Sequence, residues 1–184
     1  MPKPTKLVAW KKLHSTLLLR HARMSIIEDD VELPDGNTMK YIYQEGIRDG
    51  VSVIAVRGDE VLIQQEYSYP PNMVMHQFPG GGIEQGESPE QAAVRELKEE
   101  SGYVGKTTYL GFYFPRNRLS SSKMHVVLVS EVSPSKKEGG DAEEFITSEW
   151  VTFQALRSMI ADGEIVNFSI LAGMSFYNAK NTTQ

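Results

Sequence analysis

The sequence predicts an α+β fold in which helices cover a mixed β-sheet, and three observations lead to this prediction. β-rich runs at Val51–Val56 and Val61–Gln65 come before a helix with clear start and stop residues. Further strand candidates follow this helix, and helical segments end the chain. Elements in this order suit a sheet and helices packed in layers around a hydrophobic core.

Composition limits the classes of protein to which the chain can belong. Its 184 residues fit one domain with a short extension, and its net charge of −5 argues against general affinity for nucleic acids. Because the chain has no cysteine, it has neither disulfides nor thiolate metal sites, which fits a cytoplasmic protein. The apolar run Leu17–Leu19 is too short for a signal peptide or a membrane span, so we expect no membrane partner.

The N-terminal region predicts a basic arm followed by a β-hairpin. Residues 1–12 are expected to form a loose arm, in which Trp10 is a possible anchor. The residues Leu-Pro-Asp-Gly-Asn at 33–37 are typical of a tight turn, with strands at about 22–32 and 38–45. A lone hairpin is marginally stable in water, so we expect this one to pack on a partner.

The remaining elements follow from β-rich runs, turn residues and helical periodicity. We expect strands at 51–56, 61–65, 107–114, 123–132 and 145–151, and loops at 67–75, 80–82 and 133–142. Thr152 is expected to cap an amphipathic helix that ends at Gly163. A last helix is expected from Ser169 to about Ala179.

The helix after the glycine loop has strong capping residues at both ends. Ser88 is suited to the N-cap and Pro89 to the first helical position, and Gln91 completes a capping box. Gly102 stands where a helix commonly ends on a glycine.

Three carboxylates lie on one face of this helix. Spacings of three and four residues bring Glu96, Glu99 and Glu100 together, although like charges repel at these spacings. Ala93 and Leu97 form an apolar stripe beside them, so the helix is expected to pack on the sheet and hold the carboxylates in place. A fixed group of hard oxygen atoms is what Mg²⁺ or Mn²⁺ prefers.

Two neighbouring residues can take part in such a site. Glu87 can join the carboxylates from the loop, and Arg95 can orient or neutralise an adjacent glutamate. The alternative is a solvated acidic helix with one arginine, and spacing alone does not separate the two interpretations.

The complete pattern resembles the Nudix box. It runs Gly81, five residues, Glu87, seven residues, then Arg95-Glu96-Leu97-x-Glu99-Glu100-x-Gly102-Tyr103. The resemblance implies a Nudix hydrolase with an α/β/α sandwich around a mixed sheet and a divalent metal, Mg²⁺ or Mn²⁺. It further implies that Glu96 and Glu100 are metal ligands, that Glu99 is a further ligand oriented by Arg95, and that Gly81 gives a carbonyl ligand.

Other segments look like the ADP-ribose pyrophosphatase branch of this family. They are Leu33–Gly36, Gln64–Pro70 and Ile160–Ala172. This branch implies cleavage of a nucleoside diphosphate sugar into a nucleoside monophosphate and a sugar phosphate. It also implies a homodimer that shares N-terminal strands, so we expect 1–48 to be a dimerising extension and 49–184 the Nudix domain.

The resemblance also implies a catalytic carboxylate on an acidic loop between the last strands. Glu143 and Glu144 occupy the matching loop, and either of them or Glu99 can take the proton from the attacking water. A solvated loop charge is the alternative for Glu143 and Glu144.

Two segments depart from the pattern of the branch. Tyr67-Ser68-Tyr69-Pro70 lacks the arginine common in that strand, and Arg116-Asn117-Arg118 replaces a Ser-Pro-Gly segment. Arg116 and Arg118 are candidates for binding a phosphate, because a guanidinium matches phosphate oxygens, and a solvated loop is the alternative. Tyr67 or Trp10 is a candidate for stacking on a base, although packing is the commoner use of aromatic residues.

Two rival functions come from different classes. One is hydrolysis of dinucleoside polyphosphates or capped RNA, against which the lack of an obvious basic stripe argues. The other is a non-catalytic Nudix module that senses a ligand, which degenerate glutamates would favour, whereas all the glutamates are present here.

Overall fold

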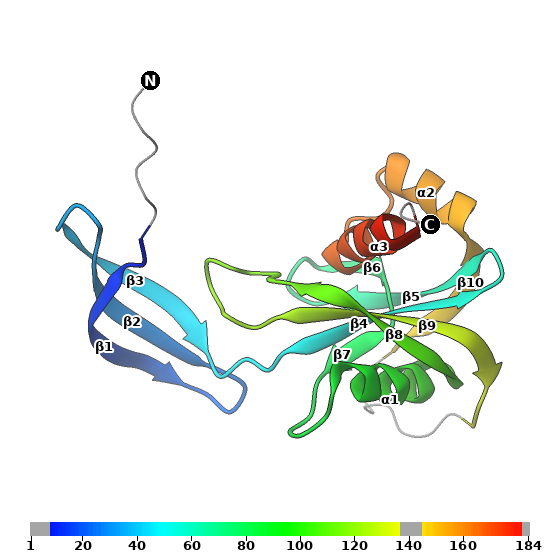
Figure 1. Cartoon of the computed structure of the whole chain (residues 1–184), viewed down its shortest axis with the longest axis horizontal. Helices are drawn as coiled ribbons and strands as arrows, with labels where there is room; N and C mark the ends of the chain where they lie inside the picture. Colours follow the sequence, from blue (N-terminus) through cyan, green and yellow to red (C-terminus); the bar gives the residue numbers. More distant parts are fainter. Residues whose placement is uncertain (1–7, 137–144, 182–184) are drawn as a thin grey trace. The chain divides into compact units, whose positions relative to one another are not determined.

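The computed structural model describes residues 8–136 and 145–181, which form two compact units (Figure 1). The N-terminal unit contains the described residues up to Ile47 together with Arg116–Ser122. The main unit contains the other described residues. Arg116–Ser122 thus belongs to the N-terminal unit, although in the sequence it lies within 49–184, the range expected to form the Nudix domain.

The N-terminal unit is a three-stranded antiparallel sheet in the order β1-β2-β3. Its strands are β1 (Lys11–Arg20), β2 (Ser25–Glu32) and β3 (Thr38–Glu45). The predicted hairpin is present as β2 and β3. In its turn, Gly36 has a φ of 87°, and the Asp35 side chain accepts a hydrogen bond from the backbone of Asn37.

β1 begins within the segment that was expected to be a loose arm, and this expectation is wrong for its last residues. The pairing of β1 with β2 has irregularities between Lys12 and His14 and between Leu17 and Leu19. Because each irregularity breaks the two-residue alternation of side chains, the sequence of β1 lacks the pattern that predicts a strand.

The segment Arg116–Ser122 lies against β3. The backbone N–H of Gln44 donates to the carbonyl oxygen of Leu119 at 2.6 Å, and the Tyr41 hydroxyl donates to that of Arg118 at 2.7 Å. These bonds fix the backbone that carries Arg118.

The main unit is built on a seven-stranded mixed sheet with the path β10-β5-β4-β9-β8. Its strands are β4 (Gly50–Arg57), β5 (Glu60–Ser68), β6 (Met73–Gln77), β7 (Gly80–Gly82), β8 (Tyr103–Tyr113), β9 (Met124–Pro134) and β10 (Thr147–Thr152). β4 and β9 are parallel, and the other pairs are antiparallel. β6 pairs with β5 and β7 pairs with β4.

Helices cover both faces of this sheet, which confirms the predicted fold class (Figure 1). The helix α1 (Pro89–Ser101) packs on one face, and α2 (Phe153–Ala161) and α3 (Phe168–Asn181) lie on the other. Thr152 caps α2 as predicted, by accepting a hydrogen bond from the backbone of Ala155. None of the helices in residues 8–136 and 145–181 is both long and apolar enough to cross a membrane.

The two loops expected before α1 are partly strands. The expected loop at 67–75 is wrong in its second half, since Met73–Gln77 folds back on β5. Asn72 makes this reversal with a φ of 55°, a backbone conformation that asparagine tolerates. Gly80–Gly82 was expected to be a loop and instead pairs with β4.

Candidate active site

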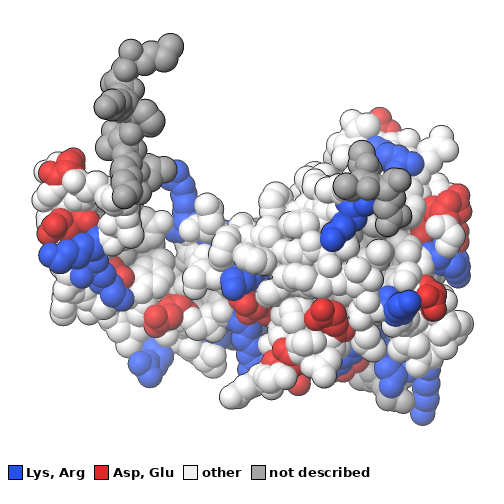
Figure 2. Space-filling view, in the orientation of Figure 1, with Lys and Arg blue, Asp and Glu red and all other residues white. Residues whose placement is uncertain are grey.

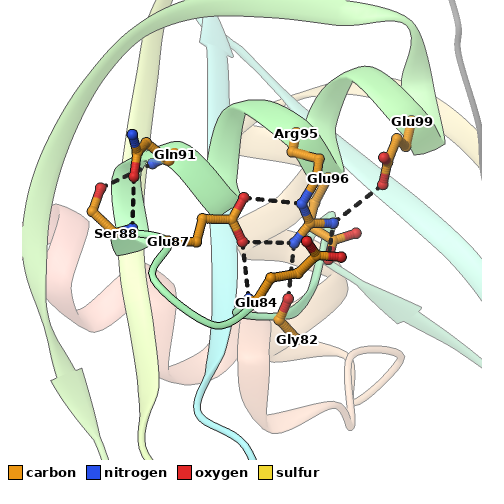
Figure 3. A network of polar contacts seen from close by, with 8 residues as sticks. All are labelled: Gly82, Glu84, Glu87, Ser88, Gln91, Arg95, Glu96 and Glu99. Carbon is orange, nitrogen blue, oxygen red and sulfur yellow. Dashed lines mark hydrogen bonds and ion pairs between the residues drawn. The ribbon is translucent and has the colours of Figure 1, made fainter.

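α1 begins and ends at the residues that the sequence predicts. The Ser88 hydroxyl accepts a hydrogen bond from the backbone of Gln91 at 3.2 Å, and the Gln91 side chain accepts one from the backbone of Ser88 at 2.8 Å (Figure 3). Gly102 ends the helix with a φ of 73°. These caps determine where α1 starts and stops beside β7.

One side of α1 is buried against the sheet. Ala92, Ala93 and Leu97 are fully buried and pack in one apolar cluster with residues of β4 and β9. This packing fixes the rotation of the helix about its axis. The directions in which Arg95, Glu96, Glu99 and Glu100 leave the helix are therefore fixed as well.

Arg95 connects α1 to the preceding loop. Its Nε and Nη2 atoms donate to the two carboxylate oxygens of Glu87, each at 3.0 Å. Nη1 donates to Glu96 Oε1 at 2.8 Å and to Glu99 Oε2 at 3.2 Å, and Nη2 also donates to the Gly82 carbonyl oxygen at 2.9 Å (Figure 3). A bidentate pair with Glu87 sets the plane of the guanidinium, which in turn orients Glu96 and Glu99.

These contacts favour the charged forms of both partners. Hydrogen bonds from Arg95 lower the pKa of Glu87 below its usual range, with a smaller contribution from the backbone N–H of Glu84. Hydrogen bonding to Glu87, and then to Glu96, raises the pKa of Arg95 above its usual value. Arg95 brings one positive charge to three carboxylates, those of Glu87, Glu96 and Glu99.

The glycine stretch allows backbone and carboxylate to approach closely. A Cβ atom on Gly80 would lie 2.0 Å from the Val51 carbonyl oxygen, and Gly80 has a φ of 152°. A Cβ atom on Gly81 would lie 2.4 Å from Glu96 Oε1. Only glycine therefore lets β7 pair with β4 and the Glu96 carboxylate lie against Gly81 without a shift of its neighbours.

Glu100 lies on the buried side of the same stretch. It is 8% exposed, and its Oε2 atom accepts hydrogen bonds from the backbone N–H of Gly80 and from Nε2 of Gln64, both at 3.1 Å. Gln64 is fully buried on β5 and also donates to Ser148 Oγ at 3.4 Å. The Glu100 carboxylate is thus held on its buried side by two donors, the side chain of Gln64 and the backbone of Gly80.

Gln64 was not among the site residues predicted from the sequence. The side-chain oxygen Oε1 of Gln64 is buried without a hydrogen-bond partner in the described part of the chain. Burying such an atom lowers the stability of a fold by about 1–3 kcal/mol. A signal was present in the sequence, because Gln64 follows Val61, Leu62 and Ile63 in a strand that is otherwise apolar at this depth. A polar residue in a buried strand needs a partner, and Glu100 is that partner.

The carboxylates fit a hard divalent cation by their chemistry. Glu96 and Glu100 lie next to Gly81 and Gly80, so two carboxylates and backbone carbonyls meet at the same stretch. Within residues 8–136 and 145–181, no three acidic or histidine side chains converge on one point as they stand. Glu96 and Glu99 each give an oxygen to Arg95 in this arrangement.

A groove of about 520 Å³ lies beside α1. Its described lining combines charged and polar side chains of α1 with one apolar residue of the helix and one residue of β8: Glu90, Gln91, Val94, Arg95, Lys98, Glu99 and Thr107. This volume is within the range of small-molecule sites. Arg95 and Glu99 therefore face both the carboxylate group and an open groove.

The structure brings together two of the residues that the sequence suggested for substrate binding. In the N-terminal unit, the ring of Trp10 packs edge-on against Tyr41, with 5.9 Å between the ring centres. The Tyr41 hydroxyl donates to the carbonyl oxygen of Arg118. The exposed ring of Trp10 and the backbone of Arg118, from a distant segment, thus share one neighbour, Tyr41.

The other suggested residues lie elsewhere. Arg116 is exposed in the N-terminal unit, and its carbonyl oxygen accepts hydrogen bonds from the backbone of Leu119 and Ser120. Tyr67 belongs to the main unit, where its hydroxyl donates to Asn72 at 2.7 Å. Glu143 and Glu144 lie outside the described residues.

Comparison with known proteins gives a consistent result. The sequence of residues 46–172 matches the family model of the NUDIX domain, and this range contains β7, α1 and Gln64. An ADP-ribose pyrophosphatase of Bacillus subtilis (strain 168) is 27% identical over 161 residues, which cover 85% of each chain. The ADP compounds hydrolase NudE of Escherichia coli (strain K12) is 29% identical over 126 residues, or 66% of this chain and 68% of that protein.

A solved structure has the same fold. A crystal structure of an ADP compounds hydrolase matches with a TM-score of 0.89 over 98% of each chain, at 22% identity. The likeness extends over the strands of both units described above.

Proposed function

We propose that this chain, which belongs to the NUDIX family, hydrolyses the pyrophosphate bond of a nucleoside diphosphate sugar with the help of a divalent metal ion. The names of the Bacillus subtilis and Escherichia coli relatives, which refer to ADP-ribose and ADP compounds, support ADP-sugars as the substrate class. Water adds to one phosphorus, the bridging P–O bond breaks, and the products are AMP and a sugar phosphate.

The observation that carries this proposal is the placement of Glu96, Glu99 and Glu100 on α1 beside the glycine stretch. Glu100 is buried and Glu96 is held by Arg95 against Gly81. Acidic groups brought together in this way repel one another and do not stabilise the metal-free protein. Such an arrangement is understandable if its role is to bind a cation.

The proposed ligands of Mg²⁺ or Mn²⁺ are Glu96, Glu100 and the carbonyl oxygen of Gly81, with Glu99 as a further ligand. When bound, such an ion neutralises the diphosphate and lowers the pKa of a water molecule. The residues of the chain position the reactants: Arg95 holds Glu96 and Glu99, while the caps of α1 keep the carboxylates in register with β7.

Glu99 is the proposed general base. Its side chain is 31% exposed, against 12% for Glu96, so it is more accessible to a water molecule. The proton of the attacking water goes to this carboxylate as the new P–O bond forms. Glu143 and Glu144 remain the alternatives from the sequence.

The proposed substrate contacts include both aromatic and cationic groups. Trp10, with Tyr41 behind it, offers an exposed ring on which a base can stack. Arg118 and Arg116 supply guanidinium groups that match phosphate oxygens. Tyr67 is a second exposed ring, 49% accessible, in the main unit.

We further propose that two copies of the chain form a homodimer through the N-terminal unit. β1 is exposed along its whole length, and its apolar side chains Leu13, Leu17, Leu18 and Leu19 are 46–55% accessible. Exposed apolar residues on an open edge strand are typical of an interface. A monomeric mass by light scattering at micromolar concentration would contradict the dimer.

The proposed location is the cytoplasm, since a chain without cysteine gains nothing from an oxidising compartment. We propose no nucleic-acid partner. Figure 2 shows Lys and Arg interspersed with Asp and Glu, without a continuous basic stripe on the face in view.

The test is a panel of nucleoside diphosphate sugars, dinucleoside polyphosphates and capped RNA, assayed for products with Mg²⁺ and with Mn²⁺. We expect the highest kcat/KM on an ADP-sugar and no turnover in excess chelator. Full activity in chelator would exclude the metal mechanism. Turnover of polyphosphates or RNA alone would replace the proposed substrate class.

A further inference from the structure

We propose that Gln64 is a positioning residue that orients the Glu100 carboxylate for metal binding. The inference rests on the proposed function, because it takes Glu100 as a ligand of the ion. Gln64 is fully buried, and its Nε2 atom donates to Glu100 Oε2 at 3.1 Å. Gly80 N donates to the same oxygen at 3.1 Å.

Two donors on one oxygen define the direction of the carboxylate. Gly80 approaches along the backbone of β7, and Gln64 approaches from β5, so the two donors come from different strands of the sheet. Glu100 itself leaves from the last turn of α1. The carboxylate, which comes from α1, is thus held by one donor from β5 and one from β7.

The sheet surroundings of Gln64 show that packing does not account for a glutamine. Leu62, two residues earlier on the same face, belongs to the apolar cluster beneath α1. Gln64 instead leaves its own carbonyl oxygen buried and unsatisfied within the described residues. A leucine would remove that unsatisfied oxygen but also one hydrogen bond to Glu100, so the two effects on stability roughly offset each other and packing does not require a glutamine. Partners that orient metal ligands commonly matter for metal affinity.

Gln64→Leu is the informative variant, with Gln64→Met as a second one in case the first does not fold. Gln65→Leu is the matched control, because Gln65 is the next residue on β5 and its side chain contacts His76 and Glu149 instead of Glu100. Mn²⁺ affinity is measured by titration calorimetry on each protein. Melting temperature without metal and the metal dependence of kcat and KM complete the set.

We expect Gln64→Leu to raise the Kd for Mn²⁺ about 10-fold or more. The melting temperature without metal should change little, because the lost hydrogen bond to Glu100 and the removal of the unsatisfied Gln64 oxygen offset each other. The same variant should lower kcat more than it changes the KM for the nucleotide substrate. Gln65→Leu should keep the Kd of the wild type. This combination separates a positioning role from a structural one, which would lower the melting temperature and leave the Kd unchanged.

The outcomes distinguish this inference from the proposed function. Unchanged Mn²⁺ affinity in Gln64→Leu and Gln64→Met, beside a wild type that binds Mn²⁺, overturns the role of Gln64 alone. A wild type that binds no Mn²⁺ overturns both. Weakened Mn²⁺ binding in the variants of a protein that cleaves no nucleoside diphosphate sugar supports Gln64 and excludes the proposed substrate.

Discussion

The two faces of the seven-stranded sheet are packed in different ways. The face under α2 and α3 buries a cluster that is entirely apolar: Ile54, Val61, Ile63, Phe78, Val126, Phe153, Leu156, Ile165, Ile170 and Met174. The face under α1 has its own apolar cluster but also buries Gln64 and Glu100 and places an oxygen of Glu96 against Gly81.

This difference separates residues that stabilise the fold from residues kept for chemistry. Apolar burial contributes roughly 25 cal/mol per Å² and needs no partner of defined geometry. A buried carboxylate or amide is costly unless hydrogen bonds satisfy it. The α1 face buries two such groups, Glu100 and Gln64. Their burial is expected if this face positions a functional site in addition to stabilising the fold.

Glu100→Gln should have the largest effect on activity. An amide is a weaker ligand and does not neutralise a cation, so turnover should fall by a factor of about 100 or more. Without metal, the variant should be as stable as the wild type or slightly more so, because one of the charges that repel beside Glu96 and Glu99 is removed. The measurements are turnover and melting curves with and without Mg²⁺.

The rise in melting temperature on adding Mg²⁺ should shrink or vanish in Glu100→Gln, since the ion stabilises the folded state by binding to it. If the variant instead keeps its turnover and loses much of its metal-free stability, Glu100 is a structural residue. The proposed site would then be wrong.

Leu156→Ala tests the opposite face. Leu156 is fully buried in the apolar cluster, so its truncation leaves a cavity and should lower the free energy of unfolding by about 2–5 kcal/mol. Urea unfolding at neutral pH measures this loss. The Mn²⁺ affinity of the folded variant should match that of the wild type, and a large change in that affinity would show that the two faces are not independent.

A pair of glycine substitutions compares the faces directly. In Gly81→Ala the new Cβ meets the flexible end of Glu96, and Gly81 is not among the residues with positive φ, so Glu96 should move and the fold should persist. In Gly173→Ala the new Cβ lies 2.8 Å from the buried ring of Phe78. We therefore expect weaker Mn²⁺ binding for the first variant, and a loss of about 1–3 kcal/mol in stability for the second.

Titration calorimetry and urea unfolding on both variants decide between these expectations. Equal losses of stability with unchanged metal affinity would mean that the glycines serve packing on both faces.

The smallest expected effect concerns pH. Because hydrogen bonds from Arg95 lower the pKa of Glu87 below its usual value, the pair stabilises the folded state fully above that usual pKa and loses its contribution as the pH falls through the folded-state pKa. Glu87→Gln should therefore cost about 1 kcal/mol at pH 7, since the pair is only partly shielded from solvent. The difference from the wild type should close on acidification, and urea unfolding from pH 7 to pH 3 measures it. A difference that is constant with pH would exclude the ion pair as its origin.

The strands and helices were predictable where local signals agree. The capping box of Ser88 and Gln91 and the glycine at position 102 act within a few residues of one another, so they define α1 without tertiary context. The paired strands β4 and β5 follow from continuous β-rich runs. β1 was missed because its irregular pairing with β2 hides the alternation, and pairing is not a local property.

The candidate site divides in the same way. Sequence spacing by itself determined that Arg95, Glu96, Glu99 and Glu100 lie along one helix, since helical periodicity fixes which side chains are neighbours. Only the tertiary structure decided that Gln64 from β5 and Gly80 from β7 share an oxygen of Glu100, and that Arg118 joins Trp10 through Tyr41. These contacts join residues far apart in the chain, whose meeting depends on strand order and register, and neither is encoded in the spacing of any single segment.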